Sequence, residues 1–313
     1  MPNETSIGGV CRLADRGVIR ASGSDAAKFL QGQLTNDVLT LARDRARLAG
    51  FCSAKGRLQA SFLVWRDEAG DYLLSCPLSI LAATLKRLSM FVLRAQCRLT
   101  DASAEIELVG VTGSAAEAML GDAPVWNCEV RGHASLIRLP DGAGERRCLV
   151  AAPAGSEIDV AAAPAMTLDT WRWLEVQSGI VTIEAATVDR FVPQMVNYEL
   201  VGGVDFQKGC YPGQEVVARS QYRGTTKRRT FLFDCETLPE AGQDVFAGGA
   251  AGEAAGTVAN AAPRPTHPGG SALVELRLAA LDSADLRLGA ADGPRLHRSA
   301  LPYAVPLEVE PTH

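Results

Sequence analysis

Eight consecutive residues of the chain read Lys208-Gly209-Cys210-Tyr211-Pro212-Gly213-Gln214-Glu215. An extended segment precedes them, and a helix-like segment, Val216 to Gln221, follows. Proline is favoured in the first turn of a helix, so Pro212 predicts a helix that begins just after Cys210. The positive end of that helix and the ammonium of Lys208 would both favour the thiolate form of Cys210.

The other side chains of this stretch also point to chemistry. Its two glycines allow close backbone approach or a positive φ. Gln214 and Glu215 place an amide and a carboxylate beside the cysteine. The simpler interpretation is a glycine turn that carries an incidental buried cysteine. The combination of all these groups at one turn favours a functional site, and Cys210 and Lys208 are the candidate catalytic pair.

The stretch matches a family signature, Lys-Gly-Cys-Tyr-x-Gly-Gln-Glu, and so resembles the YgfZ-like folate-binding proteins, relatives of the glycine-cleavage aminomethyltransferases. Further matching segments are spread over nearly the whole chain: Phe29–Asp37, Val192–Gln194, Val204–Phe206, Val217–Arg219, Arg223–Arg228 and Leu301–Tyr303. The resemblance implies tetrahydrofolate, or a derivative, as the cofactor. It also implies a folate-binding body with a ferredoxin-like subdomain, followed by a small C-terminal β-barrel.

The family resemblance and the chemistry of the stretch together give a set of candidate folate-binding residues. They are Trp171, Asn36, Asp37, Tyr211, Gln214, Glu215, Arg219 and Arg223, with Gly209 and Gly213 as backbone positions of the motif. The polar turn at Asn36 and Asp37 has a simpler interpretation, because such side chains commonly cap backbone groups. The family's other ligand-facing tryptophan, near the N-terminus, falls on Arg16 here.

Composition narrows the class of protein. The 313 residues carry a net charge of −5 with a pI near 5.5, which argues against coating of nucleic acid or anionic membrane. The eight cysteines form no C-x-x-C pair and the four histidines are scattered, so we expect no metal site. No apolar run approaches a membrane span, and the N-terminus lacks a secretory pattern. With so many free cysteines, the chain is expected in a reducing cytoplasm.

Helices alternate with antiparallel strand patterns along the chain, which predicts an α+β fold. A folate-binding body is expected over 1–227, with a ferredoxin-like subdomain over roughly 45–150. Beyond residue 228, short apolar strands alternate with Gly and Pro turns, so 228–313 is expected to form a C-terminal β-barrel. No GxGxxG or P-loop pattern occurs, so a nucleotide phosphate site is not expected.

A helix with two tryptophans follows an Ala- and Pro-rich connector. Thr167 or Asp169 is expected to cap it, and Gly179 to end it. Trp171 and Trp173, two positions apart, point to different helix faces. One of them is expected in the core, while the other would be free to stack on a flat heteroaromatic ring. Both could equally be packing residues.

A basic run, Arg219, Arg223, Lys227, Arg228 and Arg229, follows the motif. Such a run is usually solvated surface. Forked guanidinium contacts could instead hold the glutamate carboxylates of a folate. Binding of RNA phosphates is the third interpretation.

Three functions remain open on these residues. The first, implied by the resemblance, is a tetrahydrofolate-binding accessory protein that supports assembly or repair of iron–sulfur enzymes, including those that modify tRNA, with Cys210 as the reactive group. Its partners would be a reduced folate and iron–sulfur enzymes or assembly factors, with no membrane and no direct nucleic acid. The second is a folate-dependent aminomethyltransferase using Asp37 or Glu215 as the acid. The third is an RNA- or partner-binding module.

The transferase function meets one difficulty. Aminomethyl transfer needs a carboxylate near the reacting nitrogens to stabilise developing positive charge. The related transferases carry adjacent aspartates on a strand after a Gly-containing turn, and the matching positions here are Gln59 and Ala60. Neither supplies that charge, so we expect no classical turnover.

Overall fold

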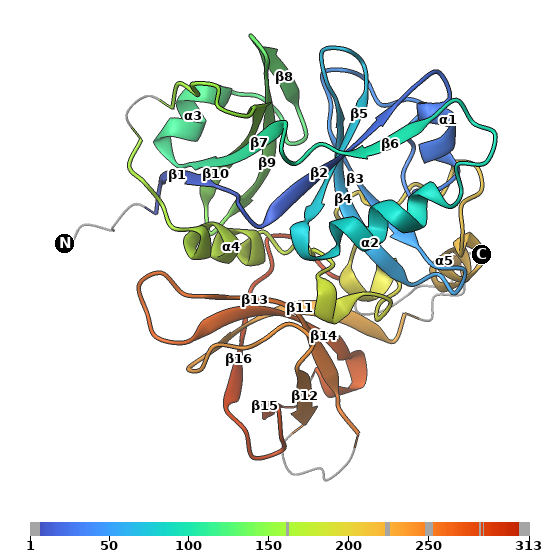
Figure 1. Ribbon diagram of the computed structural model, residues 1–313. Helices are drawn as coiled ribbons and strands as arrows, with labels where there is room; N and C mark the ends of the chain where they lie inside the picture. The colour runs from blue at the N-terminus through green and yellow to red at the C-terminus, as the bar shows by residue number, and fades with distance from the viewer. Residues whose placement is uncertain are drawn as a thin grey trace.

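The computed structural model describes residues 7–160, 163–222, 226–247, 253–281, 283 and 285–306. These residues build two five-stranded antiparallel sheets and a closed six-stranded barrel. Figure 1 shows the two sheets side by side in the upper part of the molecule, with the barrel below them. The predicted α+β class with a C-terminal β-barrel is confirmed.

The first sheet has the strand order β3-β4-β5-β2-β6. Its strands are β2 (Arg16–Ser22), β3 (Arg47–Cys52), β4 (Leu58–Arg66), β5 (Tyr72–Pro77) and β6 (Arg98–Asp101). Two helices, α1 (Ala26–Gln31) and α2 (Leu78–Ser89), add Phe29, Leu81 and other apolar side chains to a core shared with Phe62 of β4. The helical spacing of these residues produces one apolar stripe per helix, and burial of that stripe fixes the helix to the sheet.

The second sheet has the order β1-β7-β10-β9-β8. Its strands are β1 (Gly9–Arg12), β7 (Ile106–Thr112), β8 (Cys128–Arg131), β9 (Ala134–Gly142) and β10 (Glu145–Pro153), and α3 (Ser114–Leu120) packs on one face. On the other face, Ile137 and Leu149 share a core with Val18 and Trp65 of the first sheet. The two sheets therefore enclose a common interior.

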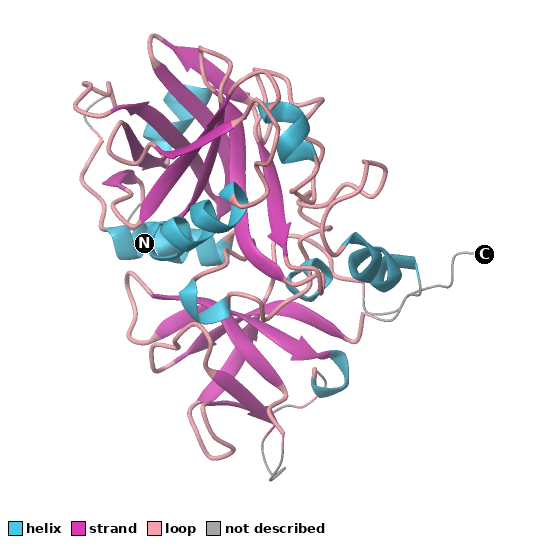
Figure 2. Cartoon of the chain, turned by 45° about the vertical axis from the view of Figure 1, so that its right-hand side comes forward, coloured by secondary structure: helices cyan, strands magenta, loops and turns pink. Residues whose placement is uncertain are grey.

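Helix α4 (Leu168–Gln177) lies between the sheets and the barrel, as Figures 1 and 2 both show. Thr167 is its N-cap, as predicted, because its hydroxyl accepts a backbone N–H of the first turn at 3.1 Å. Trp171 packs into the interior between the sheets. Trp173 points to the barrel, where its Nε1 donates to Ser271 Oγ at 3.0 Å. The two tryptophans thus tie one helix to two different parts of the molecule.

The barrel consists of β11 (Arg228–Cys235), β12 (Asp244–Ala247), β13 (Gly256–Pro263), β14 (Gly270–Arg277), β15 (Leu286–Leu288) and β16 (Arg295–Ser299). Pairing of β11 with both β14 and β16 closes it. Along the chain, α4 is followed by two short 3-10 helices, η1 (Ala185–Thr187) and η2 (Pro193–Val196), and by helix α5 (Gln214–Tyr222) before the first barrel strand. A third 3-10 helix, η3 (Leu278–Ala280), follows β14. The stretch 45–150, expected to be a ferredoxin-like subdomain, contributes strands to both sheets.

Candidate functional site

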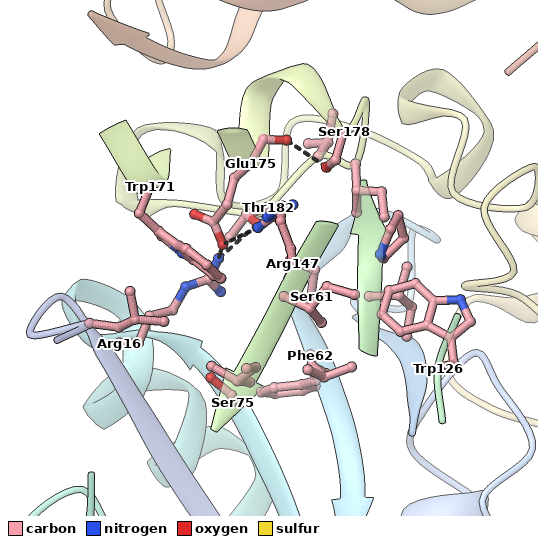
Figure 3. Close-up of a pocket in the computed structure, with 18 of the residues that line it drawn as sticks. Arg16, Ser61, Phe62, Ser75, Trp126, Arg147, Trp171, Glu175, Ser178 and Thr182 are labelled. Carbon is pink, nitrogen blue, oxygen red and sulfur yellow. Dashed lines mark hydrogen bonds and ion pairs between the residues drawn. The ribbon is translucent and has the colours of Figure 1, made fainter. Parts of the chain in front are cut away.

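A cavity lies between the two sheets and α4, and we call it the inner cavity. Its wall includes Arg16 of β2, Arg147 of β10, Trp171 and Glu175 of α4, and Trp126. Other lining residues are Leu13, Leu48, Ser61, Phe62, Leu63, Ser75, Leu139, Pro140, Leu149, Ser178, Ile180, Val181, Thr182 and Tyr198. Figure 3 shows Arg16, Trp171 and Glu175 on one side of the cavity and Trp126 on the other. Aromatic, aliphatic and charged groups thus converge on one cavity, as is typical of small-molecule sites.

The inner cavity is narrow and adjoins two wider spaces. It comprises about 630 Å³ of space between atoms, of which about 70 Å³ admits the centre of a water-sized sphere. This is room for roughly five waters. A second cavity, the outer cleft, admits the centre of a water-sized sphere over about 510 Å³. It shares Arg16, Glu175, Ile180 and Thr182 with the inner cavity. A third cavity, of about 390 Å³ by the same measure, shares Trp126, Pro140, Ser178 and Ile180 with the inner cavity. A ligand larger than the inner cavity therefore has space on either side.

Two arginines of the inner cavity share one carboxylate oxygen. Arg16 Nη2 lies 2.5 Å from Oε1 of Glu175, and Arg147 Nη2 lies 3.8 Å from the same atom. Burial lowers the pKa of Arg16 more than any single neighbour raises it, but the charge of Glu175, the charge of Asp15 and the hydrogen bond to Glu175 act together, and the pKa is raised. For Arg147, burial dominates and lowers the pKa to about 10. Glu175 is therefore mainly the ion-pair partner of Arg16, and its contact with Arg147 is the longer and weaker one.

Trp171 is a core residue as well as a lining residue. Its side chain is 1% exposed, and the guanidinium of Arg147 lies 4.6 Å from its ring centroid. The ring also presses on the backbone of Gly110, where an added Cβ would lie 2.4 Å from Cε3. The predicted stacking tryptophan is thus already in contact with a cation and with a strand, and the guanidinium stacked on it is part of the cavity wall.

The signature stretch lies elsewhere, and its cysteine does not line the inner cavity. All eight cysteines lie in the part of the chain that the structure describes, and among them Cys210 alone is exposed. Lys208 is buried, and its Nζ donates to the carbonyl oxygens of Gln31 at 2.5 Å and Leu34 at 2.6 Å. Burial lowers the pKa of Lys208 to about 8, while Asp37 opposes this shift most and Cys210 least of the three charges involved. The ammonium therefore holds the end of α1 as its main contact.

The remaining residues of the signature stretch differ in their surroundings. Tyr211 is buried, its ring centroid lies 4.9 Å from Lys208 Nζ, and burial raises the pKa of its hydroxyl. Gly213 has a φ of 78°, and an added Cβ would lie 2.4 Å from Ser53 O, so only glycine fits. A Cβ at Gly209, in contrast, would meet no described atom within 4 Å.

Helix α5 begins at Gln214, later than Pro212 predicts. Pro212 lies in the preceding turn, so Cys210 stands four positions ahead of the helix. Gln214 is half-buried, whereas Glu215 is exposed in the first turn. Neither lines the inner cavity.

Asn36 and Asp37 make local structural contacts. Asn36 Nδ2 donates to the carbonyl oxygens of Leu48 and Gly202, both at 2.7 Å. Asp37 Oδ1 accepts the backbone N–H of Leu39 at 3.0 Å. Neither residue lines the inner cavity. The simpler interpretation of this turn, side chains that cap backbone groups, describes these contacts.

Tyr198 connects the inner cavity with Gly203, a residue of the segment that precedes the signature stretch. Tyr198 lines the cavity and is fully buried, and burial raises the pKa of its hydroxyl. Gly203 packs directly on its ring, because an added Cβ would lie 2.4 Å from Cδ1. The carbonyl of Gly203 in turn accepts the hydroxyl of Thr35 at 2.6 Å. A wall residue of the inner cavity is thus supported from behind by Gly203, which Thr35 holds in place.

Two of the five residues of the basic run form ion pairs within the protein. Arg228 Nη2 donates to Glu275 at 2.8 Å, and Arg229 pairs with Glu199 in a buried contact. Arg219 is exposed on α5. Arg223 lies outside the described residues.

Sequence reasoning did not single out Arg147, Glu175 or Tyr198. Arg147 lies on β10 and Glu175 lies within the predicted tryptophan helix, and neither local sequence pattern distinguishes a wall residue from a packing residue. Within the described residues no cluster of His, Cys, Asp and Glu suits a metal ion, and no helix is long and apolar enough to cross a bilayer.

Three comparisons relate this chain to known proteins, and together they cover most of its length. Residues 8–129 match the GCVT N-terminal domain family. A solved structure, the glycine cleavage system aminomethyltransferase T from Bartonella henselae, superimposes with a TM-score of 0.75 at 16% identity, covering 94% of this chain and 86% of that one. The tRNA-modifying protein YgfZ of Edwardsiella ictaluri is 34% identical over 252 residues, which cover 75% of this chain and 74% of that protein. On this evidence the chain belongs to the YgfZ family and has the fold of the aminomethyltransferase.

Proposed function

We propose that the protein binds tetrahydrofolate or a derivative in the inner cavity and its adjoining spaces. In this role it would be an accessory protein for iron–sulfur enzymes, including those that modify tRNA. The observation that carries the proposal is the cavity between Trp171 and Trp126, lined by charged groups, in a chain of the YgfZ family. Reduced folates combine a flat bicyclic ring with an anionic tail, which suits an aromatic wall with guanidinium groups.

The exposed thiol of Cys210 serves the accessory role in this proposal. Because it lies at the surface and outside the cavity wall, it is available to a partner protein while the folate is bound. Thiol exchange, or transient contact with a cluster or persulfide, is the chemistry that such a group offers. A lone cysteine does not hold a cluster, since clusters generally need about four protein ligands.

The two other functions lack a supporting observation. For aminomethyl transfer, Gln59 and Ala60 replace the acids, and neither Asp37 nor Glu215 lines the inner cavity. Its single lining carboxylate, Glu175, is paired with Arg16. For RNA binding, the pairing of Arg228 and Arg229 engages two of the five residues of the basic run within the protein.

Calorimetric titration with 5-formyltetrahydrofolate, a stable reduced folate, tests the proposal. Wild-type protein should bind one equivalent, and W126L should bind at least several-fold more weakly because an aromatic wall is lost. W173L is the matched control, since Trp173 faces the barrel and not the cavity. Failure of the wild type to bind, or equal losses in both variants, would refute the assignment of folate to this cavity.

The accessory role has its own test in cells that lack the chromosomal gene. The measured quantity is the level of a tRNA nucleoside whose synthesis needs an iron–sulfur enzyme. The wild-type gene should restore it and C210A should not. Full restoration by C210A would remove Cys210 from the proposal.

A further inference from the structure

Arg147 is the least compensated charge of the inner cavity. It belongs to β10, its side chain is 3% exposed, and it lines the cavity. Its contacts with acceptors are long: 3.5 Å from Nη1 to Leu174 O and 3.8 Å from Nη2 to Glu175. Its Nε has no hydrogen-bond partner among the described residues. A buried cation without a close anion is destabilising, so such a group is expected to have a further partner.

The neighbouring charges do not provide that partner. Glu175 is held by Arg16 at 2.5 Å, and Asp141 is held by Arg138 at 2.6 Å. Two guanidinium groups therefore face the inner cavity, whereas the described residues of its wall include one carboxylate. The indole ring of Trp171 covers one face of the planar Arg147 guanidinium. The N–H groups at the edge of the guanidinium remain available to a hydrogen-bonding partner.

Other donors of the wall are also without partners. Tyr198 OH and Trp171 Nε1 are buried, line the cavity, and have no hydrogen-bond partner in the described part of the chain. Two acceptors of the wall, in contrast, are engaged: Ser61 Oγ accepts the N–H of Ile183 at 2.9 Å, and Oε1 of Glu175 accepts from Arg16. Buried polar groups are nearly always paired, so the surplus of donors indicates a ligand rich in acceptors.

We infer that Arg147, together with the Tyr198 hydroxyl, forms a carboxylate-binding subsite in the inner cavity. A carboxylate presents two oxygens to one guanidinium edge, and it fits a space of the size described above. Two sources share this chemistry. One is the glutamyl tail of the reduced folate, in which case the inference rests on the proposed function. The other is a small free carboxylate bound beside the folate, and this source does not depend on it.

Calorimetric titrations of R147M, which keeps an unbranched, flexible side chain but removes the guanidinium and its charge, test the subsite. Arg138→Met is the matched control, because Arg138 is similarly buried, at 5% exposure, but does not line the cavity. The probes are 5-formyltetrahydrofolate, acetate, and the N-methylamide of 5-formyltetrahydropteroate, which has neither the glutamyl group nor any other carboxylate and is called the pteroate below. Circular dichroism melting verifies folding of each variant. Tyr198→Phe provides a second route if R147M does not fold.

The subsite predicts at least a tenfold weaker binding of the carboxylate probe in R147M and a change below twofold in R138M. Y198F should bind about three- to fivefold more weakly, since one donor is lost. If the tail is the source, wild type should bind the pteroate tenfold more weakly than the folate, and R147M should bind both alike. If a free carboxylate is the source, wild type should bind acetate through Arg147 and hold folate and pteroate equally.

The outcomes separate this inference from the proposed function. Folate binding with unchanged affinity in folded R147M and Y198F, and no Arg147-dependent acetate binding, would overturn the subsite while leaving the folate proposal in place. Acetate binding that requires Arg147, without any binding of reduced folate, would support the subsite and overturn the folate proposal. Equal losses in R147M and R138M would also overturn the subsite, because they would show a structural effect of removing any buried arginine.

Discussion

The guanidinium of Arg147 stacks on the indole ring of Trp171, 4.6 Å from the ring centroid. This contact joins β10 to α4 at the wall of the inner cavity. The backbone of Gly110 on β7 supports the same ring. The position of the arginine thus depends on the position of the tryptophan, which depends on a glycine in the neighbouring strand.

Replacement of Gly110 by alanine should therefore perturb both stability and binding. The new Cβ would lie 2.4 Å from Trp171 Cε3, so the ring must move. We expect a loss of about 1–3 kcal/mol in the free energy of unfolding, measured by urea titration, together with weaker binding of 5-formyltetrahydrofolate. G209A is the control for stability, since its Cβ meets open space and should change the free energy by less than about 0.5 kcal/mol. A G110A protein as stable as G209A would contradict this account of the wall.

Cys210 should be the first cysteine to react with iodoacetamide in the native protein. It is the exposed one, whereas Cys97 is half-buried and the other six are buried. Tryptic mass spectrometry after brief alkylation at neutral pH should find the label on Cys210 before any other site. C210A should leave the melting temperature unchanged, while C97A should leave the early label in place. Early labelling spread over several cysteines would show that exposure does not control reactivity here.

Lys208 should make stability depend on pH in a defined window. Burial lowers its pKa to about 8 in the folded protein, below the 10.5 of an ordinary lysine. Between these values the unfolded chain binds more protons than the folded one, so the free energy of unfolding rises with pH. Below pH 8 both states are protonated, and the full destabilisation is present. The neutral amine retains two N–H groups for the carbonyls of Gln31 and Leu34.

Urea titrations at several pH values measure this effect by difference. The stability of wild type relative to K208M should increase by on the order of 2 kcal/mol between pH 7 and pH 10. K28M removes an exposed lysine of α1 and should keep the wild-type rise. A difference between wild type and K208M that stays constant with pH would place the titration of Lys208 outside this window.

The buried pair of Arg229 with Glu199 should be a structural contact. Both side chains are 6% exposed, and Arg229 also donates to Gln194 O at 2.9 Å. R229M should lose about 3–5 kcal/mol in the free energy of unfolding, because it leaves Glu199 buried without its partner. R219M, on the exposed face of α5, should change stability by less than about 0.5 kcal/mol. If R229M and R219M lost similar amounts of unfolding free energy, the Arg229–Glu199 pair would not be a stabilising contact.

The affinity of the protein for RNA should not depend steeply on the salt concentration. Phosphate contacts would make the logarithm of the affinity fall with the logarithm of the salt concentration. Filter binding of a bulk tRNA between low and physiological salt should give no steep slope, since Arg228 and Arg229 are paired within the protein. A steep slope that R219M reduces would revive the RNA-binding function.

The sequence alone determined the local structure and the family. Periodic apolar positions predicted the strands and helices, Thr167 was correctly expected at a helix N-cap, and the Gly- and Pro-rich texture beyond residue 228 predicted the barrel. Gly213 was expected to need special backbone freedom, and its φ of 78° requires it. These are features of neighbours along the chain, and propensity, capping and turn chemistry act over that range.

Tertiary structure alone decided which polar groups meet. Arg16, Arg147 and Glu175 lie on three different elements, far apart along the chain, yet two guanidinium groups share one carboxylate oxygen. Lys208 was expected beside a thiol, and the fold gives it the carbonyls at the end of α1. The physical reason is that burial and Coulomb interactions depend on distance in space, and a single sequence specifies that distance only through the packing of the whole chain.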